Sequence, residues 1–377
     1  MSSPFVMDGL ACGGPGPQVT GEPTMTQTND LHVVSFQPLD APSLIVDELP
    51  LGEPRAQLVD RSRQSVRDIL SGVDDRLLVV VGPCSAHDPV AVREYAGRLA
   101  EAAARLSDDL LVVMRVYFEK PRTTMGWKGL INDPDMDGSF DVHRGLRTAR
   151  ALLLDILDLG MPVGCEFLDP TSPQYLADTV TWGAIGARTT QSQVHRQLAS
   201  GMSMPIGFKN ATDGGVQDAI DACRVGQHSH VFFGVDPDGR AAVVTTTGNE
   251  DCHVILRGGS SGPNYGPESV RDVLSRLAES GLKHRIVIDA SHGNSGKDHV
   301  RQAGVAGEIA AQIADGQTGI GGVMLESFLV PGRQDIVPGL PLVYGQSVTD
   351  ACLGWETTEQ LLSALAEAAS TRRACVH

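Results

Sequence analysis

The chain has 377 residues, 41% of them hydrophobic, with a formal net charge of −16 and a sequence pI near 5.0. Such acidity argues against nucleic acid and anionic membranes as general partners. The sequence has no run of about 18 apolar residues and no basic segment followed by a short apolar one, so we expect neither a membrane span nor a signal peptide. The seven cysteines form no CxxC pair, which is typical of reduced thiols and predicts a cytoplasmic protein.

The N-terminal part of the chain divides into two predicted segments. Residues 1–30 are rich in Gly, Pro and Thr, and we expect a disordered tail. Residues 31–72 form an extension, in which residues 31–36 resemble a short strand and residues 61–70 an amphipathic helix. Residues 73–377 contain the main domain.

Eight short apolar runs give the strongest indication of fold. They cover residues 77–81, 110–114, 162–165, 182–187, 204–208, 253–256, 285–288 and 322–325. Runs of this length without polar alternation are typical of parallel strands buried on both faces. Each run is followed closely by a chemically reactive side chain: Cys84, Arg115, Glu166, Arg188, Lys209, Arg257, His292 and Glu326. This pattern predicts an α/β fold, a (β/α)8 TIM barrel with its site at the carboxyl ends of the strands.

The segments between the runs are consistent with that barrel. Helical patterns cover residues 88–107, 145–159, 172–180, 192–200, 213–225, 267–280 and 297–314, and residues 357–373 form a further helix after the barrel. Within residues 229–248, two apolar segments flank Asp236-Pro237-Asp238-Gly239. We therefore expect a β-hairpin inserted into the barrel.

Cations are concentrated near the predicted strand ends. They are Arg115, Lys120, Arg122, Arg188, Lys209 and Arg257. Arginine offers forked donors to carboxylate and phosphate, and lysine offers a point charge. Any one of them could be a solvated surface group. Together, in a strongly acidic protein, they favour a site for substrates that carry a carboxylate and phosphates.

A second group combines soft and hard metal ligands. Cys84, His292 and Glu326 follow strands, and Asp350 lies beyond the last one. A thiolate, an imidazole and two carboxylates suit Mn, Fe, Co or Zn better than Mg. The alternative is a buried structural cysteine, with carboxylates that pair with the neighbouring cations.

Several stretches resemble class I 3-deoxy-7-phosphoheptulonate (DAHP) synthase. They are GPCS at 82–85, MRVYFEKPRT at 114–123, GWKGLINDP at 126–134, GAIGARTT at 183–190, SQVHR at 192–196, GFKN at 207–210 and ILRGG at 255–259. The resemblance implies a metal-dependent transferase. Such an enzyme condenses phosphoenolpyruvate with erythrose 4-phosphate and water to DAHP and phosphate, the first step of the shikimate pathway.

The resemblance also assigns residues. By matching motif, the metal ligands would be Cys84, His292, Glu326 and Asp350. Phosphoenolpyruvate would be held by Arg115, Lys120, Arg188, Lys209 and Arg257, and the phosphate of erythrose 4-phosphate by Arg122 with Thr123. Lys120 is the candidate for proton transfer near the aldehyde, with His292 as the alternative.

Regulation is a further implication of the resemblance. It suggests a homodimer or homotetramer inhibited by an aromatic amino acid, with Pro173, Gln174 and Ser203 lining the effector pocket. The extension at 31–72 and the inserted hairpin would then pack between subunits. Alternatively, the extension only closes the bottom of the barrel.

Three positions depart from the family pattern, and two other functions remain open. Gly293 stands where Ala is common, Ala211 where Gly is common, and Gln191 where Glu is frequent. If position 211 required a positive φ, Ala would cost about 1 kcal/mol there. The rival functions are a barrel aldolase that forms a Schiff base through Lys120 or Lys209, and a non-catalytic regulatory paralogue.

Overall fold

The computed structural model describes residues 28–121, 126–282, 285–337 and 339–376. By its internal contacts the chain divides into two units, Met1–Pro38 and Leu39–His377. The helices that precede the barrel thus belong to the same unit as the barrel itself. Within the described ranges, no helix is both long and apolar enough to cross a membrane.

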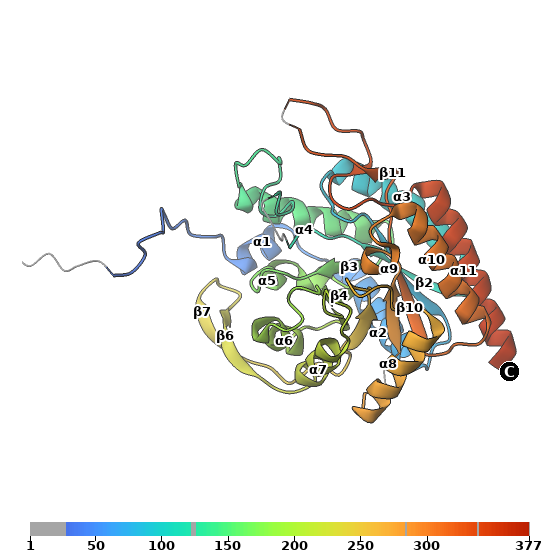
Figure 1. Cartoon of the computed structure of the whole chain (residues 1–377). Helices are drawn as coiled ribbons and strands as arrows, with labels where there is room; N and C mark the ends of the chain where they lie inside the picture. The colour runs from blue at the N-terminus through green and yellow to red at the C-terminus, as the bar shows by residue number, and fades with distance from the viewer. Residues whose placement is uncertain (1–27, 122–125, 283–284, 338, 377) are drawn as a thin grey trace, which may run out of the picture. The chain divides into compact units, whose positions relative to one another are not determined.

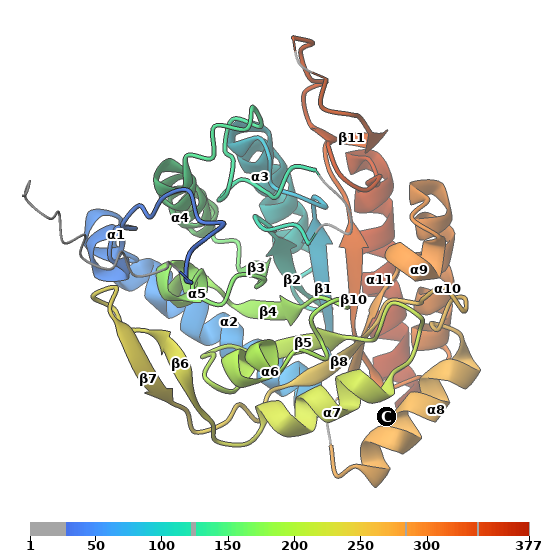
Figure 2. The same cartoon turned by 60° about the vertical axis from the view of Figure 1, so that its left-hand side comes forward.

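Eight parallel strands close into a barrel, which confirms the predicted fold class. The strands are β1 (Leu77–Gly82), β2 (Leu110–Arg115), β3 (Val163–Glu166), β4 (Trp182–Ile185), β5 (Ile206–Lys209), β8 (His253–Leu256), β9 (Ile286–Asp289) and β10 (Ile320–Glu326). Each strand pairs with the next along the chain, and β1 closes the ring by pairing with β10 in the order β1-β10-β9-β8-β5-β4-β3-β2 (Figures 1 and 2).

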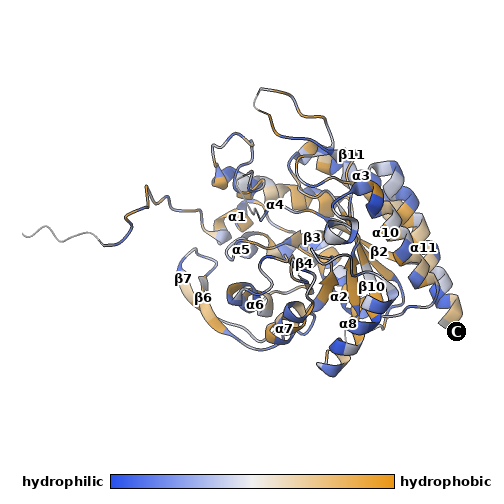
Figure 3. Ribbon diagram, viewed as in Figure 1, coloured by the Kyte–Doolittle hydropathy of each residue, from blue (hydrophilic) through white to orange (hydrophobic). Residues whose placement is uncertain are grey.

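Burial on both faces explains why these strands are continuous apolar runs. Every residue of β1 and of β10 is buried, as are all residues of β3, β4, β5, β8 and β9. Figure 3 shows the strands in hydrophobic colours, while the surrounding helices alternate between hydrophobic and hydrophilic faces. Inward side chains form a separate apolar cluster that includes Val80, Val113, Trp182, Ile255 and Met324.

Helices cover the outside of the barrel. They are α3 (Pro89–Arg105), α4 (Val142–Asp158), α5 (Pro173–Leu176) with the 3-10 turn η1 (Ala177–Thr179), α6 (Gln193–Ser200), α7 (Gln217–Gly226), α8 (Pro267–Glu279), α10 (His299–Ala314) and α11 (Trp355–Val376). Three of them begin with an aspartate cap, since Asp88 accepts from the backbone of α3, Asp141 from that of α4 and Asp298 from that of α10.

The helix before the barrel is longer than predicted. α2 spans Glu53–Ser71 rather than starting near residue 61, because the Gly52-Glu53-Pro54 sequence provides a start with proline in the first turn. Its Val66, Ile69 and Leu70 join the apolar cluster inside the barrel. α2 therefore packs against the apolar cluster inside the barrel. A short helix, α1 (Pro42–Glu48), precedes it and was not predicted.

The expectation of a strand at residues 31–36 is wrong for this chain. Residues 31 and 32 form a turn, and no strand is assigned in residues 28–41. Val34 is 101% exposed and Phe36 78%. A strand requires a neighbour with which to exchange backbone hydrogen bonds, and a short apolar sequence alone does not provide one.

Two small sheets lie outside the barrel. β6 (Val231–Val235) and β7 (Ala241–Thr245) form an antiparallel hairpin where the sequence predicts one, and Figure 2 shows it beyond the ring of strands. β11 (Val330–Arg333) and β12 (Gln346–Ser347) pair in parallel after the last barrel strand. The four-residue helix α9 (His292–Ser295) follows β9 directly. Neither the second pair nor α9 was predicted.

Candidate active site

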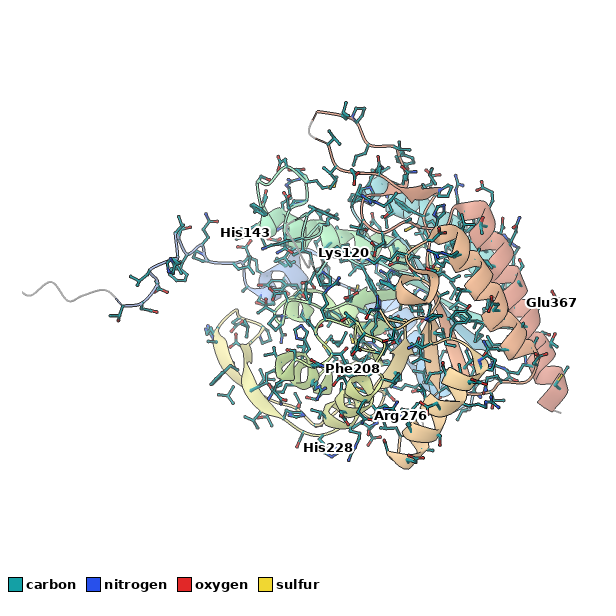
Figure 4. The ribbon with its side chains drawn as sticks, in the orientation of Figure 1. Lys120, His143, Phe208, His228, Arg276 and Glu367 are labelled. Carbon is teal, nitrogen blue, oxygen red and sulfur yellow. The ribbon has the colours of Figure 1, made fainter. Side chains whose placement is uncertain are left out.

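A polar cavity of about 270 Å³ opens where the barrel strands end. Its wall contains six of the predicted site residues, namely Lys120, Arg188, Lys209, Arg257, His292 and Asp350. Three others, Cys84, Arg115 and Glu326, are almost completely buried and connect to the wall by hydrogen bonds. Arg122 and Thr123 lie outside the described residues. In Figure 4, Lys120 lies within the body of the molecule, whereas Glu367 lies on the outer helix α11.

Arg115 and Glu326 form the buried centre of the site. Nη2 of the arginine donates to Oε1 of the glutamate over 2.8 Å, and both side chains are fully buried. Burial opposes the charge of Arg115, but Glu326 and the weaker contributions of Tyr117, Cys84 and Asp289 together outweigh burial and raise the pKa of the guanidinium. Its Cζ also lies 3.7 Å from the ring centroid of Tyr117. Arg115 thus secures Glu326 and does not itself line the cavity.

Glu326 is kept ionised by its neighbours. Burial alone would raise its pKa, yet His292 and Arg115 outweigh burial and lower the pKa of Glu326 to about 2. Its Oε2 accepts from the hydroxyl of Ser291 at 2.8 Å. An ionised buried carboxylate with free coordination capacity is suited to bind a cation.

The ligand atoms of Cys84, Glu326 and Asp350 all lie within 4.8 Å of one another. Nε2 of His292 is 3.7 Å from Oε1 of Glu326, so the fourth predicted ligand borders the same group. Burial, followed by the charge of Glu326, raises the pKa of the Cys84 thiol. Metal binding would therefore have to displace a proton from sulfur. The donor set fits a divalent transition metal.

Lys120 connects this group to the cavity. Its Nζ donates to the carbonyl of Cys84 at 2.8 Å and lies 3.3 Å from the sulfur. Burial opposes its charge, but Cys84 and the nearby Glu326 raise the pKa of Lys120 above its ordinary value. The side chain is therefore a protonated ammonium, able to donate a proton and poorly suited to act as a nucleophilic amine.

Asp289 orients two residues of the wall. Its Oδ2 lies 2.9 Å from Nδ1 of His292 and 3.3 Å from Nζ of Lys209. The contact with His292 is close but misaligned for a hydrogen bond. Burial would raise the pKa of Asp289, but its contacts with His292 and Lys209 together outweigh burial and hold that pKa well below its usual range. His292 itself has a left-handed backbone with φ of +51°, which is uncommon for a residue with a side chain.

The remaining cations crowd one another. Burial lowers the pKa of Arg257; Asp289 opposes this shift, and the charge of Arg188 adds to it. The backbone N–H of Arg257 donates to Oδ1 of Asn210 at 2.7 Å, which holds the strand end in place. An anion that enters a cavity lined by several cations is stabilised by their charge.

Comparison with known proteins identifies the family of this chain. The model of the DAHP synthetase I family matches residues 52–363. The chain belongs to the DAHP synthetase I family. A phospho-2-dehydro-3-deoxyheptonate aldolase of Corynebacterium glutamicum is 56% identical over 354 residues, which is 92% of this chain and 96% of that protein. The structure of the enzyme of that name from Francisella tularensis SCHU S4 has a TM-score of 0.89 at 50% identity, covering 90% of this chain and 99% of the other.

Membership of the DAHP synthetase I family makes this chain an enzyme of the first step of aromatic biosynthesis. Relatives with names that specify an effector include the Phe-sensitive enzyme of Escherichia coli K12, 53% identical over 92% of this chain and 99% of the relative. Others are called Tyr-sensitive and Trp-sensitive. Several relatives are thus named for their sensitivity to an aromatic amino acid, and the family is generally one of metalloenzymes.

A second cavity, of about 590 Å³, contains the three predicted effector residues of this DAHP synthetase I chain. Pro173, Gln174 and Ser203 lie on its wall together with Phe232 and Phe233 of the hairpin. The same three residues also border a neighbouring cavity of about 450 Å³. The predicted residues are thus brought together on the wall of one cavity.

Sequence reasoning missed several residues of the first cavity. Glu166 at the end of β3 lines it, and its Oε1 would lie 2.4 Å from a Cβ placed on Gly186. Lys297 also lines it and donates to Asp350 at 3.1 Å. The sequence could have indicated Glu166, since it directly follows an apolar run. The residues next to it in the sequence do not indicate what it does. The role of Asp289 likewise becomes clear only from its contacts with Lys209 and His292 in the structure.

Proposed function

We propose that the first cavity condenses phosphoenolpyruvate with erythrose 4-phosphate and that the residues named above perform the steps. The observation that carries this proposal is the convergence of Lys120, Arg188, Lys209 and Arg257 on the ligand group of Cys84, Glu326 and Asp350. The cations neutralise two phosphorylated substrates that would otherwise repel each other. The same cations fix the reacting carbons at attack distance.

Phosphoenolpyruvate occupies the cation-rich wall in this proposal. Arg188 and Arg257 offer forked donors to its phosphate and carboxylate, and Lys120 and Lys209 add point charges. Arg115, which the sequence assigns to the same substrate, lies behind this wall and holds Glu326. Arg122 and Thr123 are proposed to bind the phosphate of erythrose 4-phosphate, on the sequence alone.

The metal site is proposed to use Cys84, His292, Glu326 and Asp350, with Mn, Co, Fe or Zn as the metal. A divalent metal bound there would supply Lewis-acid polarisation of the aldehyde oxygen. Arg115 keeps the Glu326 carboxylate in place for it. Asp289 restrains His292 on the opposite side.

Proton transfer falls to Lys120. As C3 of phosphoenolpyruvate forms a bond to the aldehyde carbon, the ammonium of Lys120 gives its proton to the aldehyde oxygen. Water then adds at C2, and phosphate leaves with cleavage of the C–O bond. The raised pKa of Lys120 keeps the proton on this residue, and it disfavours the rival Schiff-base mechanism there because that mechanism needs a neutral amine. His292 is the alternative donor.

Regulation is proposed at the second cavity. An aromatic amino acid would fit a space lined by Pro173, Gln174 and Ser203 with hairpin phenylalanines. We also propose a homodimer or homotetramer in which the hairpin contacts another subunit. The exposed apolar residues of the hairpin support this, since Val231 is 64%, Phe233 94% and Val243 69% exposed. The substitution Ser203→Phe should fill the cavity and abolish inhibition while leaving kcat within a few-fold.

The decisive experiment follows phosphoenolpyruvate in the purified enzyme. Its consumption should require erythrose 4-phosphate and should yield one DAHP and one phosphate per molecule consumed. Borohydride in the presence of substrates should not inactivate the enzyme covalently. Covalent trapping on a lysine would favour the Schiff-base aldolase instead. A protein that binds phosphoenolpyruvate without turnover under any metal would be the non-catalytic paralogue.

A further inference from the structure

One buried carboxylate connects the two cavities. Glu119 is only 4% exposed and immediately precedes Lys120, which lines the first cavity. Its Oε1 accepts from the backbone N–H of Asp169 at 2.9 Å, and its Oε2 accepts from the hydroxyl of Ser172 at 2.7 Å. A longer contact of 3.4 Å joins Oε2 to the N–H of Leu168. We name Glu119 with these three partners the Glu119 clamp.

The clamped segment forms part of the wall of the second cavity. Pro170 and Thr171 lie within it, Pro173 and Gln174 follow it directly, and all four line that cavity. The carboxylate therefore joins the segment after β2, which presents Lys120, to the segment that an effector would touch. A displacement of that segment would either break three hydrogen bonds to a buried carboxylate or move Glu119 with it.

A histidine holds the same segment from the opposite side. Nε2 of His195 lies 2.8 Å from the carbonyl of Leu168, and Nδ1 lies 2.9 Å from the hydroxyl of Ser192. Because a carbonyl can only accept, Nε2 carries the proton and Nδ1 accepts from serine. His195 belongs to α6, whose Val194 and Leu198 line the second cavity. Hydrogen bonds thus connect Glu119 to residues 168–172 and, through Leu168, to His195 of α6.

The other end of the connection reaches the metal ligands. Lys120 donates to the carbonyl of Cys84 and touches its sulfur. The covalent link between Glu119 and Lys120 completes a path from the second cavity to the first. Each step along it is a direct contact in one packed region, which is the kind of connection through which two sites influence each other.

We propose that Glu119 is a positioning residue through which occupancy of the second cavity changes the placement of Lys120 and hence the affinity for phosphoenolpyruvate. This inference rests on the effector role proposed above for that cavity. An occupant that shifts residues 168–172 pulls the Glu119 clamp and withdraws the ammonium from the substrate. Conversely, bound phosphoenolpyruvate fixes Lys120 and resists that shift, since coupling between two sites is reciprocal.

The test measures binding and not turnover. Calorimetry gives the Kd of phosphoenolpyruvate with and without millimolar phenylalanine, tyrosine or tryptophan, and the ratio of the two values is the coupling factor. It also gives the Kd of each amino acid alone. The variants are Glu119→Gln and Ser172→Ala, which cut the same hydrogen bond from its two ends. Glu94→Gln, an exposed carboxylate on α3, is the matched control.

The expected result is loss of coupling with retention of the effector. In both clamp variants the amino acid should bind within about threefold of its wild-type Kd, and the coupling factor should fall below about twofold. The double variant should lose no more coupling than either single variant, because both substitutions remove the same hydrogen bond between Ser172 and Glu119. Glu94→Gln should behave as wild type. If Glu119→Gln unfolds, Ser172→Ala still decides the question.

Three results would overturn the inference. One is wild-type coupling in both clamp variants, and another is loss of amino-acid binding itself, which would place Glu119 in the binding site. The third is a wild-type enzyme whose affinity for phosphoenolpyruvate none of the three amino acids alters. In each case consumption of phosphoenolpyruvate that depends on erythrose 4-phosphate would leave the proposed function standing.

Discussion

Arg115 and Glu326 are both fully buried, and their side chains meet at 2.8 Å between the ends of β2 and β10. A buried pair of this kind is expensive to break, because the remaining charge is left without a partner. We predict that Arg115→Leu lowers the free energy of unfolding by about 3–5 kcal/mol. Denaturant titration measures this change.

A surface pair provides the control for that prediction. Arg93 and Asp155 approach at 3.6 Å with side chains 61% and 45% exposed, so Arg93→Leu should cost less than about 1 kcal/mol. Arg115→Leu should also weaken metal binding, since Glu326 loses the cation that keeps it ionised. Equal losses of stability in the two variants would contradict the role assigned to the buried pair.

The cation wall predicts a separation between the two substrates. Arg188→Ala should raise the KM for phosphoenolpyruvate, and Arg122→Ala should raise the KM for erythrose 4-phosphate. Loss of one charged partner should cost about 2–5 kcal/mol of substrate binding. Steady-state kinetics with each substrate varied in turn provides the measurement. Variants that perturb both substrates equally would show that the pocket assignment is wrong.

The strand positions could be predicted because a strand that is buried on both faces is a continuous apolar run. Such a run can be recognised in the sequence alone. All eight predicted runs are barrel strands, and the side chains that follow them gather at one end. Residues 31–36 show the limit of the same rule, since a strand also needs a neighbour. The helix α9 and the β11–β12 pair are too short to carry a periodic pattern.

The roles of individual site residues depended on contacts that sequence spacing does not encode. Asp289 orients Lys209, 80 positions earlier in the chain, and Arg115 lies behind the cavity because Glu326 attracts it there.

The departures from the family pattern also needed the structure. Ala211 does not have a positive φ. The backbone strain that Ala would cause at a positive φ therefore does not arise. Gln191 donates to Asp218 at 2.6 Å, where a glutamate would meet a like charge.

Gly293 gives a prediction specific to this chain. A Cβ at this position would lie 2.4 Å from the nitrogen of Gly259 and 2.6 Å from the carbonyl carbon of Gly258. Gly293→Ala, which restores the residue common in the family, should therefore displace the loop after Arg257. The KM for phosphoenolpyruvate should rise about three- to tenfold, because a small misplacement of a binding group is costly.

A glycine in open surroundings is the control for Gly293. A Cβ added to Gly304 in α10 would meet no neighbouring group within 4 Å. Gly304→Ala should therefore leave the KM unchanged and add up to about 1 kcal/mol of stability. Should Gly293→Ala prove kinetically silent, the close approach of the two loops would not matter for substrate binding.

Glu119 predicts a particular dependence of stability on pH. Burial outweighs its hydrogen bonds and raises the pKa of Glu119 from 4.5 to about 7. A raised carboxyl pKa means that the folded state binds the proton more tightly than the unfolded state. The resulting stabilisation is complete below pH 4.5 and is lost as pH rises through 7.

Replacing the carboxyl should remove that dependence. The free energy of unfolding of Glu119→Gln minus that of wild type should increase from pH 4.5 to above pH 7, by an amount on the order of a few kcal/mol. Chemical denaturation at several pH values measures it. A difference that stays constant across this range would mean that folding does not raise the pKa of Glu119.

Metal dependence tests the central claim most directly. The enzyme is treated with a chelator, and phosphate release from phosphoenolpyruvate is followed with erythrose 4-phosphate before and after Mn, Co, Fe or Zn is added back. We predict that chelation abolishes release, that at least one of these metals restores it, and that Cys84→Ala remains inactive and metal-free with an intact fold. Full activity in a metal-free preparation, or restored activity in Cys84→Ala, would contradict the account.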